Sequence, residues 1–187
     1  MNNCELFHAK LSERLSNLTC YRISIHSTTF YNCHSNSEGA ALFISTTGIL
    51  EIGQTTFCLC STTSIAGASS CTVSELTMKE SCYYDCFSAS SEEDVYHAAK
   101  IFGAKSESAV DVSLCGFAFC PRDIADTDET IAIWYNCIAL FKENNLTKNI
   151  GREEALIFYV NSLAKDSVIH CNFEGNREGS MIYDVLE

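Results

Sequence analysis

Carboxylates that could perform acid–base chemistry concentrate in one polar segment of the sequence. Asp123, Asp126, Asp128 and Glu129 lie close together, and Asp111 lies earlier, among alternating apolar residues. Glycoside hydrolysis requires two positioned carboxylates, whereas an oxygen-rich loop can bind a hard cation such as Ca²⁺. We interpret the cluster as a solvated insertion loop, with weak calcium binding as the alternative.

Histidine and cysteine are the other residue types that could carry chemistry. The five histidines share no metal-ligand spacing, and we interpret each as a surface or turn residue: His8, His26, His34, His97 and His170. The twelve cysteines include no Cys-x-x-Cys pair and nothing like the paired spacing of a zinc site. The sequence therefore predicts no catalytic residue, no cofactor and no metal site. Two aromatic pairs, Tyr83-Tyr84 and Trp134-Tyr135, each place one ring inward and the other on an outer face, which could bind sugars or partners.

Composition excludes several classes of partner. The chain has 187 residues, of which 47% are hydrophobic, and a formal net charge of -12. Because negative charge repels phosphates, we expect no nucleic acid partner and no attraction to anionic membranes. No apolar run reaches the roughly 20 residues of a membrane span. Met1–Lys10 does not resemble a signal peptide, so the chain is either cytosolic or part of a longer secreted protein.

The elements that must position these residues form an internal repeat. Each copy has two apolar residues separated by one position, then an aromatic residue or Leu, then Cys or Asn three residues later. The six copies are Ile23, Ile25, Phe30 and Cys33; Leu50, Ile52, Phe57 and Cys60; Leu76, Met78, Tyr83 and Cys86; Val110, Val112, Phe117 and Cys120; Ala139, Phe141, Leu146 and Asn149; and Asp166, Val168, Phe173 and Asn176. A second apolar stretch follows most copies, and 39–44 and 154–158 are clear examples.

Repeats of this length with two or three short strands are typical of a solenoid. We expect an all-β fold, a right-handed parallel β-helix of about six coils, because parallel crossovers are overwhelmingly right-handed. Residues 1–22 would be an irregular or capping lead-in forming a partial coil, and 23–187 the repeats. Within the lead-in, Leu6–Leu18 could instead form a short helix. The aromatic positions would stack into an inward column, from Phe30 to Phe173.

Two further inward columns consist of small residues. One is the Cys/Asn column that ends each copy, and the other contains Thr28, Thr55, Ser81, Cys115, Asn144 and Cys171. Asn would hydrogen-bond to the next coil and to local backbone, and Cys would fill the same space as a small apolar residue. Stacked cysteines come close enough for disulfides, so both free and bridged thiols remain open.

The motifs resemble a known family of repeats. Phe173-Glu174-Gly175-Asn176 and Gly39-Ala40-Ala41-Leu42 are similar to the paired F-x-x-N and G-G-A-[I/L/V] repeats of chlamydial polymorphic outer-membrane proteins. The F-x-x-C form in Phe30–Cys33 is closer to the cysteine-rich repeats of trichomonad surface proteins. The resemblance covers about residues 23–185, and it implies adhesion and surface exposure. The membrane β-barrel of the bacterial members has no counterpart in this sequence.

These observations favour a non-enzymatic β-helix module of a larger surface or secreted protein, which offers a binding or adhesion face. The expected partners are a host-surface protein or a glycan, and uncapped coil ends would allow self-association. The alternative function is a carbohydrate-active β-helix enzyme, a polysaccharide hydrolase or lyase. The Asp-Asp pair and Gly-His-Gly motif of β-helix polygalacturonases are absent. The alternative location is the cytoplasm.

Overall fold

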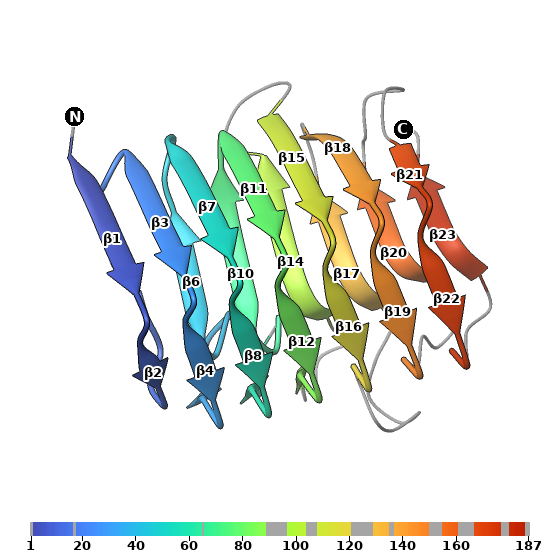
Figure 1. The fold of residues 1–187 in the computed structure, drawn as a ribbon, viewed down its shortest axis with the longest axis horizontal. Coiled ribbons are helices and arrows are strands. Elements are labelled where there is room, and N and C mark those ends of the chain that lie inside the picture. Colours follow the sequence, from blue (N-terminus) through green and yellow to red (C-terminus); the bar gives the residue numbers. More distant parts are fainter. Residues whose placement is uncertain are drawn as a thin grey trace.

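The chain forms a parallel β-solenoid, and the computed structural model describes residues 2–16, 18–64, 66–88, 97–103, 108–120, 129–134, 137–149, 155–160, 167–176 and 180–185. Every regular element in these ranges is a β-strand, and none is a helix. All strand pairs are parallel, and each strand pairs with its equivalents in neighbouring coils. Strand β1 lies at one end of the stack, and β21 to β23 lie at the other (Figure 1).

Four sheets run along the stack, and we number them first to fourth. The first sheet contains β1 (Asn3–Phe7), β3 (Arg22–His26), β7 (Ile49–Gly53), β11 (Glu75–Lys79), β15 (Ser108–Ser113), β18 (Cys137–Lys142) and β21 (Ser167–Ile169). The second contains β2 (Lys10–Leu11), β4 (Thr29–Tyr31), β8 (Thr56–Cys58), β12 (Cys82–Tyr84), β16 (Gly116–Ala118), β19 (Asn145–Thr147) and β22 (Asn172–Glu174). The third contains β6 (Leu42–Ser45), β10 (Ser69–Val73), β14 (His97–Gly103), β17 (Glu129–Trp134), β20 (Ala155–Val160) and β23 (Ser180–Val185). The fourth contains β5 (His34–Ser35), β9 (Ser61–Thr62) and β13 (Phe87–Ser88).

The apolar positions of the repeat form the core that holds the first and third sheets together. The register confirms the predicted columns: Ile23 pairs with Leu50, and Leu50 with Leu76. These side chains are buried, while their strand neighbours point outward. Side chains alternate across a strand, so a strict two-residue apolar pattern gives each strand one core face. Position Asp166 of the last copy lies outside the described residues.

The aromatic column is confirmed as a stack of buried rings. Ring centroids lie 5.0 Å apart for Phe30 and Phe57, 4.5 Å for Phe57 and Tyr83, and 5.0 Å for Tyr83 and Phe117. Each buried ring contributes roughly 1.5–3 kcal/mol to stability. The buried Tyr83 hydroxyl needs a partner, and Ser69 Oγ of β10 lies 2.7 Å away. The column continues through Leu146 to Phe173.

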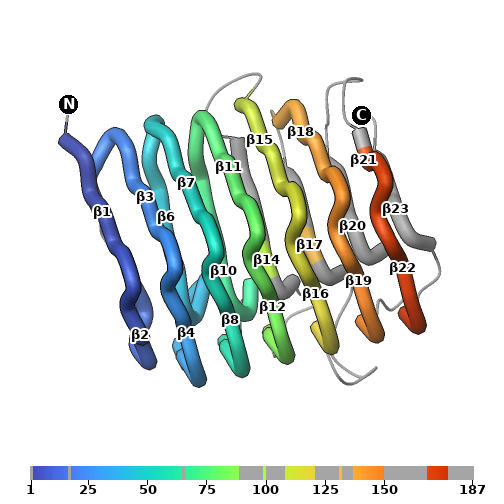
Figure 2. Tube along the Cα trace, viewed as in Figure 1, coloured from blue at the N-terminus to red at the C-terminus, as the bar shows by residue number. Residues whose placement is uncertain are grey.

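Each coil bends sharply at a residue with a left-handed backbone. Positive φ recurs just before each small inward residue, as at Gln54 (φ 50°) before Thr55 and Leu59 (φ 56°) before Cys60. The bends between β3 and β4, β7 and β8, and β11 and β12 lie side by side along the stack (Figure 2). Left-handed conformations cost L-residues about 1–2 kcal/mol each, so other interactions must stabilise them.

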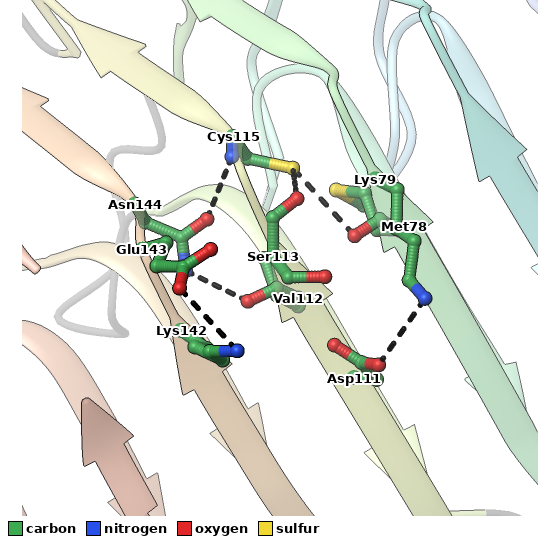
Figure 3. Close-up of polar contacts among 9 residues, drawn as sticks. All are labelled: Met78, Lys79, Asp111, Val112, Ser113, Cys115, Lys142, Glu143 and Asn144. Atoms are coloured by element: carbon green, nitrogen blue, oxygen red, sulfur yellow. Dashed lines mark hydrogen bonds and ion pairs between the residues drawn. The ribbon is translucent and has the colours of Figure 1, made fainter. Parts of the chain in front are cut away.

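Ladders of hydrogen bonds from the small inward residues stabilise the bends. In Figure 3, Asn144 Oδ1 accepts from the Cys115 backbone N–H (2.8 Å), and Asn144 Nδ2 donates to Val112 O (2.7 Å). Cys115 Sγ is 3.3 Å from Ser113 O and 3.7 Å from Met78 O. In the second column, Asn149 Nδ2 likewise donates to Phe117 O (2.8 Å).

Cysteine occupies the same role as asparagine in these columns. Cys60 Sγ is 3.7 Å from Phe30 O, and Cys86 Sγ is 3.5 Å from Phe57 O, the carbonyls equivalent to those that Asn149 and Asn176 contact. These cysteines fill the buried space as expected, and their thiols also donate hydrogen bonds to the carbonyls. Cys33, Cys60 and Cys86 are thiols rather than members of stacked disulfides.

Residues 1–22 contribute strands to the stack. Strand β1 pairs with β3, and β2 pairs with β4. Leu11 thereby pairs with Phe30 and extends the aromatic column by one coil. No helix forms in 6–16, and the helical alternative for Leu6–Leu18 was therefore wrong there. A disulfide joins Cys4 of β1 to Cys20 just before β3, which the sequence did not single out.

Candidate functional site

The carboxylates that could serve an enzyme fall in two places. Asp123, Asp126 and Asp128 lie outside the described residues, as does most of the insertion 121–129, and the side chain of Glu129 in β17 is not described either. Asp111 lies on the outer face of β15, where Oδ2 is 3.8 Å from Lys79 Nζ (Figure 3). It is therefore an ion-paired outer residue rather than part of the acidic cluster.

Three histidines occupy structural positions, and the side chain of a fourth is not described. His8 and His170 have positive φ at bends, and His26 stacks against Phe7 with centroids 5.5 Å apart. The side chain of His97 in β14 lies outside what the structure describes. Across the described part of the chain, no cluster of three His, Cys, Asp or Glu residues could hold a metal ion. His34 lines a hollow on the surface.

Exposed aromatic rings gather at the corner between the second and fourth sheets. Tyr83 packs inward, whereas Tyr84 is 41% exposed and Tyr31, at the equivalent position two coils earlier, is 44% exposed. Phe119 meets Tyr84 edge-on at 5.5 Å. We call Tyr31, Tyr84 and Phe119 the corner rings. The inside–outside division expected for Tyr83-Tyr84 is confirmed; Tyr135 of the other pair lies beyond the described residues, as does the side chain of Trp134.

Lysines lie over two of the corner rings. Lys10 Nζ is 5.5 Å from the centroid of Tyr31, and Lys148 Nζ is 5.4 Å from that of Phe119. Cation–π pairs at exposed sites contribute roughly 0.5–1 kcal/mol each. Each lysine therefore places its ammonium group against an aromatic ring of the corner.

A solvent-open hollow of about 390 Å³ lies on the fourth sheet, beside the corner rings. Its lining contains no charged side chain and consists of His34, Ser35, Asn36, Ser61, Thr62, Thr63 and Phe87. Register explains its shape: His34 pairs with Ser61, and Ser61 with Phe87, so a small residue lies between two large ones. We call this hollow the fourth-sheet groove.

Hydrogen bonds fix the side chain of His34 in this groove. Nε2 lies 3.1 Å from Asn32 Oδ1, and Nδ1 lies 2.6 Å from Ser61 Oγ. Because Oδ1 can only accept, Nε2 donates to it, and in the neutral form of the ring Nδ1 accepts the Ser61 hydroxyl hydrogen. The two contacts fix the orientation of the imidazole and place Ser61 Oγ on the groove floor.

The backbone N–H groups beside the Ser61–His34–Asn32 chain are used in sheet pairing. An acyl-transfer site needs backbone donors aimed at an oxyanion. The backbone N–H of Ser61 donates to Cys33 O (2.9 Å), and that of Thr63 donates to Ser35 O (3.2 Å), so sheet pairing already uses both. The arrangement offers hydroxyls, an imidazole and a ring for binding.

Gly67 fixes the position of Phe87 in the groove. A Cβ at Gly67 would lie 2.2 Å from Phe87 O, so only glycine allows the two backbones to approach this closely. The sequence did not single out Ser61 or Phe87. The repeat nevertheless held a usable pattern, because His34, Ser61 and Phe87 each follow directly after a cysteine of the Cys/Asn column.

A second hollow, of about 340 Å³, lies on the outer face of the first sheet. It extends over β11, β15 and β18, and its lining includes the carboxylates of Glu75 and Asp111. Small outer residues such as Ala109 leave room for it. Asp111 Oδ1 is buried and has no hydrogen-bond partner among the described residues.

No family model matches the chain, and the searches of curated proteins and of solved structures likewise give no significant match. The described residues include no helix long and apolar enough to cross a membrane.

Proposed function

We propose that this chain is a non-enzymatic β-helix module of a larger surface or secreted protein, and that its corner is a binding or adhesion face. The coils are right-handed and about six in number, since parallel crossovers strongly favour that hand and the repeat has six copies. The resemblance to polymorphic outer-membrane proteins and trichomonad surface proteins supports the same assignment. The face would bind a host-surface protein or a glycan, and no nucleic acid.

The observation that carries the proposal is the exposure of aromatic rings at one corner. Tyr31 and Tyr84 each leave more than a third of their surface in water, and Phe87 is 36% exposed in the adjoining groove. Exposed aromatic clusters are typical of interaction surfaces, where Tyr and Trp contribute much of the binding energy. A separate set of buried rings fills the core, so the packing of the core does not require the corner rings.

The disulfide supports an oxidising location. Disulfides persist in secreted and surface proteins and are rare in the cytosol, and Cys4 is joined to Cys20. Thiol counting on protein from its natural source, under denaturing and non-reducing conditions, separates the two locations. Ten free thiols support secretion or surface display, and twelve support the cytoplasmic alternative.

Binding of the labelled chain to cultured cells tests the adhesion face. We expect saturable binding that falls about tenfold in the double variant Tyr31→Ser, Tyr84→Ser. The matched control is Leu114→Ser, because Leu114 is 52% exposed but lies on a bend beside the first sheet. Equal binding by both variants, or no saturable binding on any cell type, would contradict an adhesive corner.

The hollow on the first sheet favours one alternative, a polysaccharide hydrolase or lyase. Glu75 and Asp111 line it from neighbouring strands, and glycosidases use two carboxylates several ångströms apart. Screening acidic and neutral polysaccharides for new reducing ends or unsaturated products tests this function. Turnover that is lost in Asp111→Asn, Asp126→Asn or Asp128→Asn would replace the non-enzymatic proposal.

A further inference from the structure

We infer that the fourth-sheet groove is a subsite for one neutral sugar ring, held between His34 and Phe87 above Ser61. This inference rests on the proposed binding function and specifies a ligand class for the groove beside the corner rings. It is carried by the spacing of the walls, the unused hydrogen-bonding groups and the absence of charge in the lining.

The spacing of the walls matches a single saturated ring. His34 and Phe87 lie on strands separated by the strand of Ser61, so their backbones are two strand spacings apart, roughly 9.6 Å. A ring seated midway would lie about 4.8 Å from each wall, the separation at which aromatic side chains stack. The hollow of about 390 Å³ is large enough for such a ring and open for chain extension.

The hydrogen-bonding groups of the groove complement a hydroxyl-rich ligand. Ser61 Oγ makes one hydrogen bond, to His34 Nδ1 at 2.6 Å, and in either direction of that bond it keeps a lone pair that can accept from a ligand hydroxyl. Ser35 Oγ accepts from the Ser37 backbone N–H (3.0 Å), and nothing in the described residues accepts its hydrogen. One group that accepts and one that donates suit two neighbouring hydroxyls, because each sugar hydroxyl can do both.

Thr62 does not take part in this recognition. Its Oγ1 donates to Ser37 O (2.8 Å) and accepts from the Ser64 backbone N–H (3.0 Å), so it holds the turn that forms the rim. The rim side chains Asn36 and Thr63 are exposed and neutral. With no cation in the lining and a net charge of -12 on the chain, a uronate or a sulfated sugar would be repelled rather than neutralised.

Titration of the whole chain with oligosaccharides, followed by saturation-transfer NMR, tests the inference. The probes are the β-1,4-linked tetrasaccharides of glucose, mannose and N-acetylglucosamine, with tetragalacturonate as the acidic comparison. At least one neutral probe should bind at least about tenfold more tightly than tetragalacturonate. Phe87→Ala should weaken that binding about tenfold by removing the stacking wall.

A second variant tests the floor of the groove. Ser61→Leu fills the space between the walls and should abolish binding, while the outward strand position remains compatible with folding. Matched controls are Phe7→Ala, which removes an exposed ring from β1, and Thr56→Leu, which enlarges an outward residue of β8 in the same coil. Both controls should bind as the unaltered chain does.

The inference is overturned if no neutral probe binds, if tetragalacturonate binds best, or if Phe87→Ala and Ser61→Leu bind normally. Its failure is distinguishable from failure of the adhesion proposal. Cell binding that depends on Tyr31 and Tyr84, yet is unaffected by Ser61→Leu and by excess neutral oligosaccharide, would leave the corner face intact and remove the sugar subsite.

Discussion

The side chain of Asn149 is fully buried at a bend and makes two hydrogen bonds to backbone groups. Its Oδ1 accepts the backbone N–H of Cys120 at 2.9 Å, and its Nδ2 donates to Phe117 O at 2.8 Å. Both partners belong to the preceding coil, so one side chain satisfies two backbone groups that water cannot reach. A thiol at this position supplies a weaker donor with longer contacts, as Cys60 does.

Replacing Asn149 by Leu should therefore destabilise the chain severely. Two buried backbone groups would lose their partner, at about 1–3 kcal/mol each, which gives a loss of about 2–6 kcal/mol in the free energy of unfolding. Asn149→Cys should cost less than half of that. Urea unfolding followed by circular dichroism measures both, with exposed Asn145→Leu as the control. Equal losses for Leu and Cys would show that the column needs only bulk.

Burial also controls the ionisation of the core thiols. Removal from water raises the pKa of Cys71 to about 12, and burial likewise raises that of Cys115 to about 12. In the unfolded chain both thiols ionise near the ordinary value of 9.0. Above pH 9 the unfolded state therefore releases protons that the folded state retains, and stability must fall as pH rises from 9 towards 12.

The contribution of one thiol to this alkaline destabilisation can be isolated. Cys71→Val keeps a small apolar residue in the core and removes the titrating group. We expect the loss of stability between pH 9 and 11 to become shallower by about 1.4 kcal/mol per pH unit. Unfolding free energies across that range measure it. Cys82→Ser is the control, since Cys82 is exposed, and an equal change in both variants would contradict the assignment to burial.

At the scale of the element, the bends explain how straight strands form a closed coil. Bend residues with positive φ include Gln54, Glu80, Leu114 and Glu143, which precede successive members of one ladder. None of them is glycine, although glycine adopts this conformation most readily. The ladder hydrogen bonds stabilise the conformation, so these bend positions do not require glycine.

Among these bend residues, Leu114 has the side chain least suited to a left-handed backbone conformation. It has φ 56° and is 52% exposed, so its side chain gains little from packing. Leu114→Asn should increase the free energy of unfolding by about 0.5–1 kcal/mol, because Asn tolerates the left-handed region. Thermal unfolding measures the gain. Ile169→Asn, at a partly exposed strand position, should instead lose stability, and a loss in both variants would contradict the backbone argument.

The sequence predicted the strands whose apolar side chains recur at fixed spacing. It missed strands that recur in the structure but lack that side-chain pattern. The register of Phe30, Phe57 and Tyr83 followed from fixed spacing, because stacked coils place equivalent residues in contact. Strand β10 (Ser69–Val73) was not identified, since its polar serines hide the apolar pattern and Ser69 is buried to serve Tyr83. The fourth-sheet groove was missed because a hollow depends on the contrast between neighbouring coils.

At the scale of the whole molecule, the stack has ends that expose its core. Among the described residues β1 pairs only with β3, and beside it an apolar hollow of about 120 Å³ is lined by residues that include Cys4, Leu6, Leu15 and Leu18. Phe7, also on β1, is half exposed. An unpaired parallel edge beside exposed apolar side chains recruits other strands, and head-to-tail stacking does not close.

The isolated chain should therefore associate through this end as its concentration rises. The weight-average mass, measured by analytical ultracentrifugation over a wide concentration range, should increase without reaching a fixed dimer. Phe7→Lys should suppress the increase, because a lysine on an edge strand opposes strand addition through charge and hydration. Leu114→Lys adds the same charge at an equally exposed apolar residue in the middle of the stack, and should associate as before. Equal suppression by both variants would assign the effect to net charge, and a monomer at every concentration would contradict association through the end.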